Sequence, residues 1–169
     1  TAAREIAVHF CFELGFTGQE PGELLDRAMT RQTFASIGEE EPLYAEFPNE
    51  AQRAYISSLV KGVYAHGPEL DEYISKYAIG WRFERMNRVA VAIMRVAMYE
   101  ILYMQDIPNA AAINEAVELT KHYEEPEMVS FVNGILGSFV RGEYIPDPVV
   151  SGERAGGDGK AVPRPEEQG

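Results

Sequence analysis

The segment from residue 88 to residue 105 constrains the fold more than any other, because it is apolar on almost every side of a helix. After its first residue only Arg95 and Glu100 carry charge, and Asn87 stands where a helix cap is expected. A helix that is hydrophobic all round lies at the centre of a protein. The two charges argue against a membrane span. The sequence therefore predicts an all-α domain built around this central helix.

Six further segments have apolar residues at helical spacing, with the glycines, prolines and caps that begin and end helices. These predicted helices cover residues 2–15, 21–33, 50–66, 69–78, 109–123 and a last segment from Pro126. Between the second and third of them, residues 38–50 form an acidic stretch with two prolines that is typical of a loop. With the central helix these make about seven helices.

The stretch SFVNGIL, residues 130–136, contains an Asn-Gly pair between apolar couples, which is a strong signal for a β-hairpin. A hairpin also needs arms that alternate between apolar and polar residues. The apolar residues here repeat at helical spacing instead, so the prediction is a helix. Its interior contains Gly134 and Gly137, each of which costs about 1 kcal/mol relative to alanine. That cost indicates the close approach of another element or of a ligand.

The chain of 169 residues suits one compact domain, predicted at residues 1–145, followed by a polar tail. Residues 146–169 are rich in glycine, proline and charge, and we expect them to be disordered. The single cysteine, Cys11, permits no internal disulfide and fits a reducing compartment. No apolar run is long enough to cross a membrane. We therefore expect a cytoplasmic protein that has no membrane partner.

Charge is unevenly distributed along the chain, whose net charge is −12. That excess of acids argues against a surface that attracts nucleic acid everywhere. Between residues 76 and 95, however, five bases and one acid give a net charge of +4. This basic island is a candidate anion site, or else a solvated helix end balanced by acids elsewhere in the fold. Its bases are Lys76, Arg82, Arg85, Arg88 and Arg95.

Binding is the kind of function that the motifs favour. The sequence contains no catalytic constellation, no glycine-rich phosphate loop and no metal-binding pattern, so we expect no catalytic residue, metal or cofactor. Arginines recur every three residues from Arg82 to Arg88, close to Tyr77 and Trp81. Arginines among aromatic rings are typical of single-stranded RNA recognition. A lone tryptophan such as Trp81 is nevertheless more often part of a core than a stacking surface.

Four blocks of sequence together resemble the NusB family of bacterial transcription antitermination factors. They are AREIAVHFCFELGF, WRFERMNRVAVAIMRVAMYEIL, DIP followed by AINEAVEL, and FVNGILG, in this order from about residue 2 to residue 141. The resemblance implies an all-helical fold of two packed helical subdomains and no enzyme activity. It also implies binding to the single-stranded boxA element of ribosomal RNA leader transcripts, together with NusE, a protein of the small ribosomal subunit. The pair would help RNA polymerase, within an antitermination complex, to ignore termination signals.

This resemblance and the basic island together give a set of candidate site residues. Those expected to contact RNA are Arg4, Lys76, Arg82, Arg85, Arg88, Phe131 and Asn133. The basic residues would contact phosphates, and the phenylalanine, which matches an RNA-contacting aromatic of the family, would stack on a base with the asparagine beside it. Glu127 matches, approximately, an acidic position that the family links to pairing with NusE. Glu84 is a second candidate for that partner contact.

Two alternatives stay open from the sequence. The chain could be a protein-interaction adaptor with weak affinity for RNA, since basic residues are sparse at its N-terminus and Ser130 stands before Phe131. It could also be the accessory domain of a ribosomal RNA cytosine methyltransferase, an enzyme whose N-terminal part looks like NusB and which continues into a nucleotide-binding α/β domain. The polar tail argues against this second alternative. NusB-like proteins occur as monomers and as homodimers, so the oligomeric state stays open as well.

Overall fold

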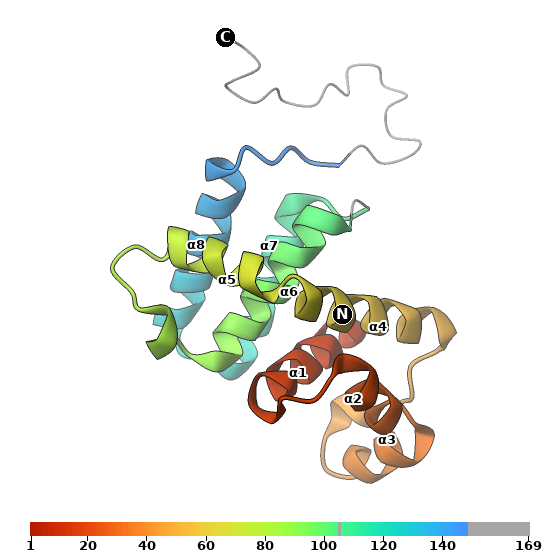
Figure 1. The fold of residues 1–169 in the computed structure, drawn as a ribbon. Coiled ribbons are helices and arrows are strands. Elements are labelled where there is room, and N and C mark those ends of the chain that lie inside the picture. Colours follow the sequence, from red (N-terminus) through yellow and green to blue (C-terminus); the bar gives the residue numbers. More distant parts are fainter. Residues whose placement is uncertain (105, 149–169) are drawn as a thin grey trace. The chain divides into compact units, whose positions relative to one another are not determined.

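A computed structural model describes residues 1–104 and 106–148 of the chain (Figure 1). Within these residues the regular structure is helical throughout, with eight α-helices and two short 3₁₀-helices, which confirms the predicted all-α class. The described chain forms two compact units that divide at residue 67, in agreement with the two helical subdomains expected. Most of the predicted tail lies outside the described residues, and the domain boundary at residue 145 stays a prediction.

The first unit contains four α-helices and one 3₁₀-helix. They are α1 (Ala2–Thr17), α2 (Pro21–Ala28), α3 (Arg31–Gly38), η1 (Pro42–Tyr44) and α4 (Glu50–Ala65). Helices α1 and α4 lie along each other, and α2 packs on both. The side chains of Leu24, Phe34, Ile56 and Leu59 are almost completely buried and form the core of this unit. Asn49 and Gln52 form a capping box at the start of α4, so the cap predicted there is confirmed.

Two predicted boundaries in the first unit are wrong, and capping explains both. The helix expected at residues 21–33 is interrupted at Met29, because the Thr30 side chain accepts a hydrogen bond from the amide of Thr33 and starts a new helix. Helix α1 passes Gly15 and ends two residues beyond it, where Gly18 adopts a left-handed conformation with φ +69°. Glycine adopts that conformation without steric cost, which makes Gly18 the terminating residue.

The predicted loop at residues 38–50 contains η1, which holds a polar contact in the interior of the first unit. Tyr44 is buried, and its hydroxyl lies 2.9 Å from His9 Nδ1. Burial lowers the pKa of His9, and this effect outweighs the opposing charges of Glu5 and Glu41. The same burial raises the pKa of Tyr44. Both pKa shifts favour the uncharged form of the side chain.

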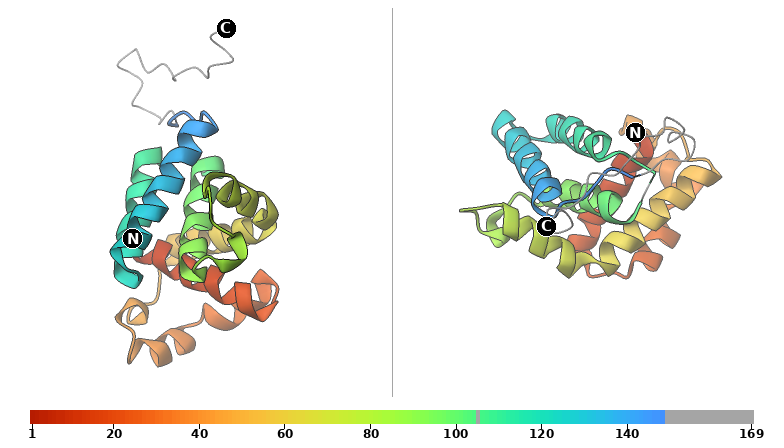
Figure 2. Two further views of the ribbon diagram at one scale, coloured as in Figure 1. Left: turned by 90° about the vertical axis from the view of Figure 1, so that its left-hand side faces the viewer. Right: turned by 90° about the horizontal axis from the view of Figure 1, so that it is seen from above.

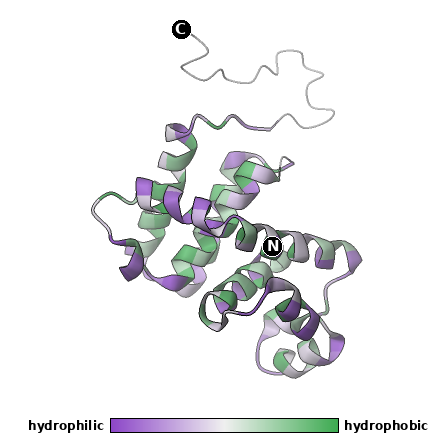
Figure 3. Cartoon of the chain, viewed as in Figure 1, coloured by the Kyte–Doolittle hydropathy of each residue, from purple (hydrophilic) through white to green (hydrophobic). Residues whose placement is uncertain are grey.

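The second unit is a helical bundle around the central helix predicted from the sequence. Its elements are α5 (Gly67–Tyr77), η2 (Phe83–Arg85), α6 (Arg88–Tyr103), α7 (Asn109–Tyr123) and α8 (Pro126–Gly142). Helix α6 packs on α7 and α8, which pack on each other, and the three lie side by side in Figures 1 and 2. The Asn87 side chain caps α6 by accepting from the amide of Ala90. Figure 3 shows apolar residues along α6 and α8 and hydrophilic residues around η2.

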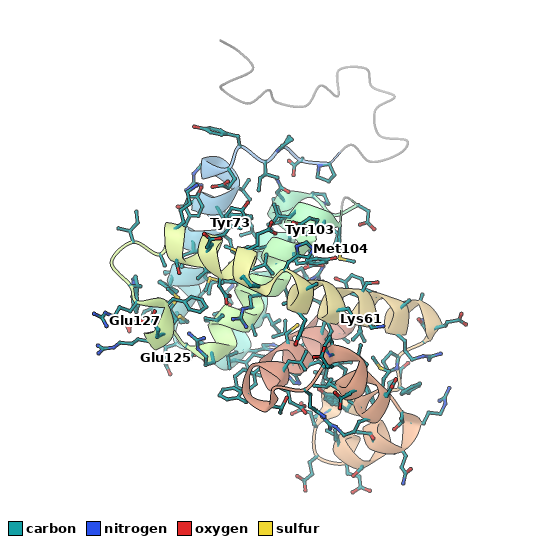
Figure 4. All side chains as sticks on the ribbon, viewed as in Figure 1. Lys61, Tyr73, Tyr103, Met104, Glu125 and Glu127 are labelled. Atoms are coloured by element: carbon teal, nitrogen blue, oxygen red, sulfur yellow. The ribbon has the colours of Figure 1, made fainter. Side chains whose placement is uncertain are left out.

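Polar contacts attach α5 to the rest of the second unit. The Arg95 guanidinium of α6 donates to both carboxylate oxygens of Asp71, at 2.7 and 2.8 Å. The hydroxyl of Tyr103 donates to Glu69 at 2.7 Å, and this hydrogen bond is the main reason why the pKa of Tyr103 is raised to about 12. Figure 4 labels Tyr73 and Tyr103, which come from α5 and α6. These polar pairs add to the apolar face of α5, where Leu70 and Ile74 are fully buried.

The SFVNGIL stretch is helical, as its periodicity predicts. It lies within α8, where Val132, Ile135, Leu136 and Phe139 are buried. The expectation that another element approaches Gly134 is wrong for the described residues, because a Cβ built there would have no atom within 4 Å. At the other interior glycine, Gly137, the neighbouring atoms belong to the Arg141 side chain of the same helix. The space around Gly134 is therefore open, and no neighbour among the described residues requires a glycine there.

The first turn of α7 is capped by the segment that follows α8. Its N-cap residue is Pro108, whose side chain makes no capping hydrogen bond. The backbone amide of Asn109 instead donates to Asp147 Oδ1 at 2.7 Å, and the side-chain amide of Asn109 donates to the carbonyl of Ile145 at 3.0 Å. The segment after α8 is thereby tied to the start of α7, and a carboxylate is well placed at the positive end of a helix.

Candidate nucleic-acid interface

The basic island forms a tight connection between α5 and α6, which we call the cationic turn (residues 79–88). Gly80 has φ +85°, and the amide of Trp81 donates to the carbonyl of Ala78 at 3.0 Å, so the chain reverses directly after α5. The 3₁₀-helix η2 follows, and Asn87 then starts α6. Three arginines that the sequence places three residues apart are thus presented on one short, hydrogen-bonded segment.

Arg82 and Arg85 are the most accessible cations of the cationic turn. Both are exposed, and no ion pair of theirs is found within residues 1–104 and 106–148. Arg88 differs, because its guanidinium donates to the carbonyls of Met86 and Phe83, at 3.1 and 2.5 Å, and lies over the Phe83 ring. Arg88 therefore stabilises the turn itself, while Arg82 and Arg85 are open to an anion.

Two other bases of the island are neutralised by acids, so the net charge of +4 overstates its strength. Lys76 pairs with Glu143 at 2.6 Å, and Tyr77 donates to the same carboxylate. The hydrogen bond with Glu143 raises the pKa of Lys76, and the hydrogen bonds from Lys76 and Tyr77 lower the pKa of Glu143. Arg95 is paired with Asp71. For these two bases, the second interpretation of the basic island is therefore correct, because acids elsewhere in the fold balance their charge.

Trp81 of the cationic turn and Phe131 of α8 form an aromatic pair. The rings of Trp81 and Phe131 have their centroids 4.6 Å apart and are tilted by 57°. Phe131 is half-buried, whereas Trp81 is 54% exposed. The expectation that Trp81 belongs to the core is therefore wrong. Asn133 and Gly134, on the same helix as Phe131, are exposed.

Arg4 is placed differently from the other predicted RNA contacts. It lies in the first turn of α1, in the first unit, and only 8% of it is exposed. Its amide donates to the Thr1 hydroxyl, which caps that helix. Burial of its side chain weighs against direct contact with a phosphate. Its predicted role is the least supported of the set.

The two acidic candidates for partner contact are both on the surface of the second unit. Glu84 is exposed within η2, and Glu127 is exposed in the first turn of α8. Figure 4 labels Glu127 together with Glu125, which precedes the helix. Glu127 also lies four residues before Phe131, which places both on the same face of α8. The exposed carboxylate of Glu127 therefore lies on the Phe131 face of α8.

Sequence reasoning missed the aromatic pair and the ion pairs for one physical reason. Each joins residues from different elements, and the partner of Lys76, for example, follows it by 67 residues. One usable signal was present: Trp81 follows a glycine between two predicted helices, a position more typical of a surface turn than of a core. No group of three or more potential metal ligands is found in the described part of the chain.

These features define a class: an all-helical protein of two compact units, with arginines and an aromatic pair gathered on the second. Comparison with known proteins then gives the family. The sequence matches the NusB family over residues 1–141, and the chain belongs to this family. Among residues 1–104 and 106–148, no helix has both the length and the hydrophobicity that a membrane span requires.

Similar sequences are known from bacteria. The transcription antitermination protein NusB of Symbiobacterium thermophilum is 41% identical over 141 residues, which cover 83% of this chain and 88% of that protein. The protein of the same name from Acetivibrio thermocellus is 37% identical over 140 residues, which cover 83% and 87%. Since these relatives align over most of their own length, they lack the large additional domain that the methyltransferase alternative requires.

Solved structures share the fold. NusB of T. maritima superimposes with a TM-score of 0.68 at 23% identity, covering 83% of this chain and 89% of that one. A crystal structure of antitermination factors NusB and NusE in complex with double-stranded RNA contains a chain that superimposes with a TM-score of 0.66 at 23% identity, covering 83% and 95%. At 23% identity, this structural similarity shows that these proteins share the fold of the present chain.

Proposed function

We propose that this protein acts in transcription antitermination in the cytoplasm, by binding boxA-type single-stranded RNA together with NusE within an RNA polymerase antitermination complex. Membership of the NusB family over residues 1–141 is the observation that carries the proposal. The curated relatives bear the name of an antitermination protein and no enzyme name. The structure of NusB and NusE with RNA supports the choice of partners.

The cationic turn and the exposed part of α8 are the surface proposed to contact RNA. Arg82 and Arg85 bind phosphates, because they are exposed and lack an acidic partner among the described residues. Phe131 and Asn133 contribute an aromatic ring and a hydrogen-bonding amide. Lys76 and Arg88 add positive charge nearby while keeping their intramolecular contacts, and buried Arg4 is left out.

The partner protein is proposed to use the acidic positions. Glu84 and Glu127 are exposed and border the RNA surface, so a basic protein that contacts both would also cancel charges that repel phosphate. With this arrangement, a chain with a net charge of −12 should bind RNA more tightly with the partner than alone. Glu84→Gln and Glu127→Gln should weaken the pairing with NusE.

A titration of fluorescein-labelled boxA-type RNA, with and without NusE, tests this proposal. We expect the double variant Arg82→Gln/Arg85→Gln to weaken binding and to lower the slope of log K against log salt by about 1.4, since each phosphate contact on a single strand contributes about 0.7. Arg141→Gln is the matched control. It removes an exposed arginine from the last turn of α8, about 15 Å along the helix from Phe131.

Each outcome of the titration has a distinct meaning. Equal affinity and equal salt slope for the wild type, the double variant and the control would show that the cationic turn is not the RNA surface. Absence of RNA binding in both mixtures, with NusE still bound, would replace the proposal by the protein-interaction adaptor. Binding that the double variant loses and the control retains supports the proposed surface.

A further inference from the structure

Of the two rings of the aromatic pair, that of Trp81 offers a nucleobase the larger exposed surface. The two ring centroids are only 4.6 Å apart, so the rings touch and leave no gap that a base could enter. Phe131 is half-buried with one side against Trp81, whereas Trp81 is 54% exposed. A base that stacks here without separating the pair must therefore lie on the indole.

Contacts on both the backbone and the ring hold Trp81 in place, although its side chain is exposed. Its backbone amide donates to Ala78, a buried residue at the end of α5, and the turn before it depends on the positive φ of Gly80. On one side its ring rests on Phe131, which is anchored in α8 between residues of the core. A platform that is already ordered loses little conformational entropy when a ligand binds.

Exposed charges of both signs come from the segments that carry the two rings. Arg82 follows Trp81 directly and Arg85 lies three residues further on, so phosphates next to a stacked base meet two exposed cations. Glu84 in η2 and Glu127 on the Phe131 face of α8 repel phosphate. A neutral base tolerates these carboxylates, whereas phosphates favour the two arginines.

We propose that Trp81 is the stacking platform for one nucleobase of the bound strand, and that Phe131 is a positioning residue that supports the indole from behind. This inference rests on the proposed RNA-binding function, and it specifies which aromatic ring stacks on the base. It predicts that loss of the indole weakens binding more than loss of the phenyl ring does, although the phenyl ring lies in the more recognisable sequence block.

The protein contains a single tryptophan and nine tyrosines, so fluorescence excited at the long-wavelength edge, where tyrosine does not absorb, reports on Trp81 alone. Titration with boxA-type RNA should quench this emission with the same midpoint as the anisotropy of fluorescein-labelled RNA. Trp81→Ala should raise Kd roughly 5- to 150-fold, the range for removal of one stacked base, and leave the salt slope unchanged. Trp81→Phe should recover most of the affinity, and Phe131→Leu should cost less than Trp81→Ala.

Ile79→Ser is the matched control, because Ile79 is 87% exposed in the same turn and is apolar but not aromatic. We expect its Kd to equal that of the wild type, whereas an equal loss in Ile79→Ser and Trp81→Ala would indicate a general apolar patch and overturn the platform. Circular dichroism should show that each variant is folded.

The anisotropy readout separates failure of this inference from failure of the proposed function. RNA that binds without quenching, and with the same Kd for Trp81→Ala, would overturn the platform and leave the function intact. A wild type that binds no RNA with or without NusE would overturn both.

Discussion

Substitution of Gly142 by alanine should destabilise the second unit, although alanine is the better helix former. A Cβ at this position would overlap the Tyr77 hydroxyl and come within 2.7 Å of Tyr77 Cζ. The ring must then move, which breaks the 2.5 Å hydrogen bond from Tyr77 to Glu143 and disturbs the edge-on contact with Phe139. Helix α8 and α5 would lose one of the contacts that join them.

The magnitude follows from these contacts. A hydrogen bond to a charged group contributes about 1.5–3 kcal/mol when buried, and we take about 1–2 kcal/mol here because Glu143 is partly exposed. The aromatic contact adds about 0.5–1 kcal/mol. The helix propensity of alanine offsets at most about 1 kcal/mol. The net loss is about 1–2 kcal/mol, or a decrease in Tm of roughly 2–8 °C for a chain of this size.

Gly134→Ala makes the same chemical change in the same helix and should have the opposite effect. Gly134 is exposed with no atom within 4 Å of a built Cβ, so alanine adds about 0.5–1 kcal/mol of stability. Urea unfolding followed by circular dichroism measures both variants against the wild type. The reasoning is refuted if Gly142→Ala is as stable as Gly134→Ala, since the contact with Tyr77 would then have no energetic consequence.

Two further predictions concern the first unit and the cationic turn. Because the pKa of His9 is lowered from 6.5 in the folded state, its contribution to stability is complete above pH 6.5 and is lost as the pH falls below that value. The wild type should therefore lose more unfolding free energy between pH 7.5 and pH 5.5 than His9→Gln does, and equal losses would contradict the assignment. Gly80→Ala should cost about 1–2 kcal/mol in urea unfolding, because a left-handed conformation at φ +85° strains alanine even where space is open. A variant as stable as the wild type would show that the turn relaxes.

The fold was predictable wherever a periodic segment had local signals at both ends. Asn87, Pro108 and Pro126 mark helix starts that the structure places within one or two residues of the predicted positions. The prediction was wrong at Thr30, because apolar spacing continues through Met29 while the threonine cap begins a new helix. The capping residue therefore decided where the helix ended, although the apolar periodicity continued.

The candidate site was less predictable, because it depends on which charges meet in three dimensions. Lys76, Arg82, Arg85 and Arg88 are equivalent by sequence, yet two of them are exposed without an ion pair in the described residues, one is paired and one bonds to the turn. Those differences arise from groups such as Glu143, which only the fold brings close. The exposure of Trp81 likewise depends on its contact with another helix.

The cap that Asp147 supplies to α7 has a consequence for the order in which the protein matures during synthesis. The amide of Asn109 donates to a carboxylate that follows it by 38 residues in the sequence. Helices α3 and α4 in the first unit are instead capped by the residues directly before them, Thr30 and Asn49. Domains generally fold from the N-terminus as the ribosome extends the chain. The first unit can therefore fold early. The unit that carries the cationic turn and the aromatic pair completes its hydrogen bonds only after residue 147 has left the ribosome.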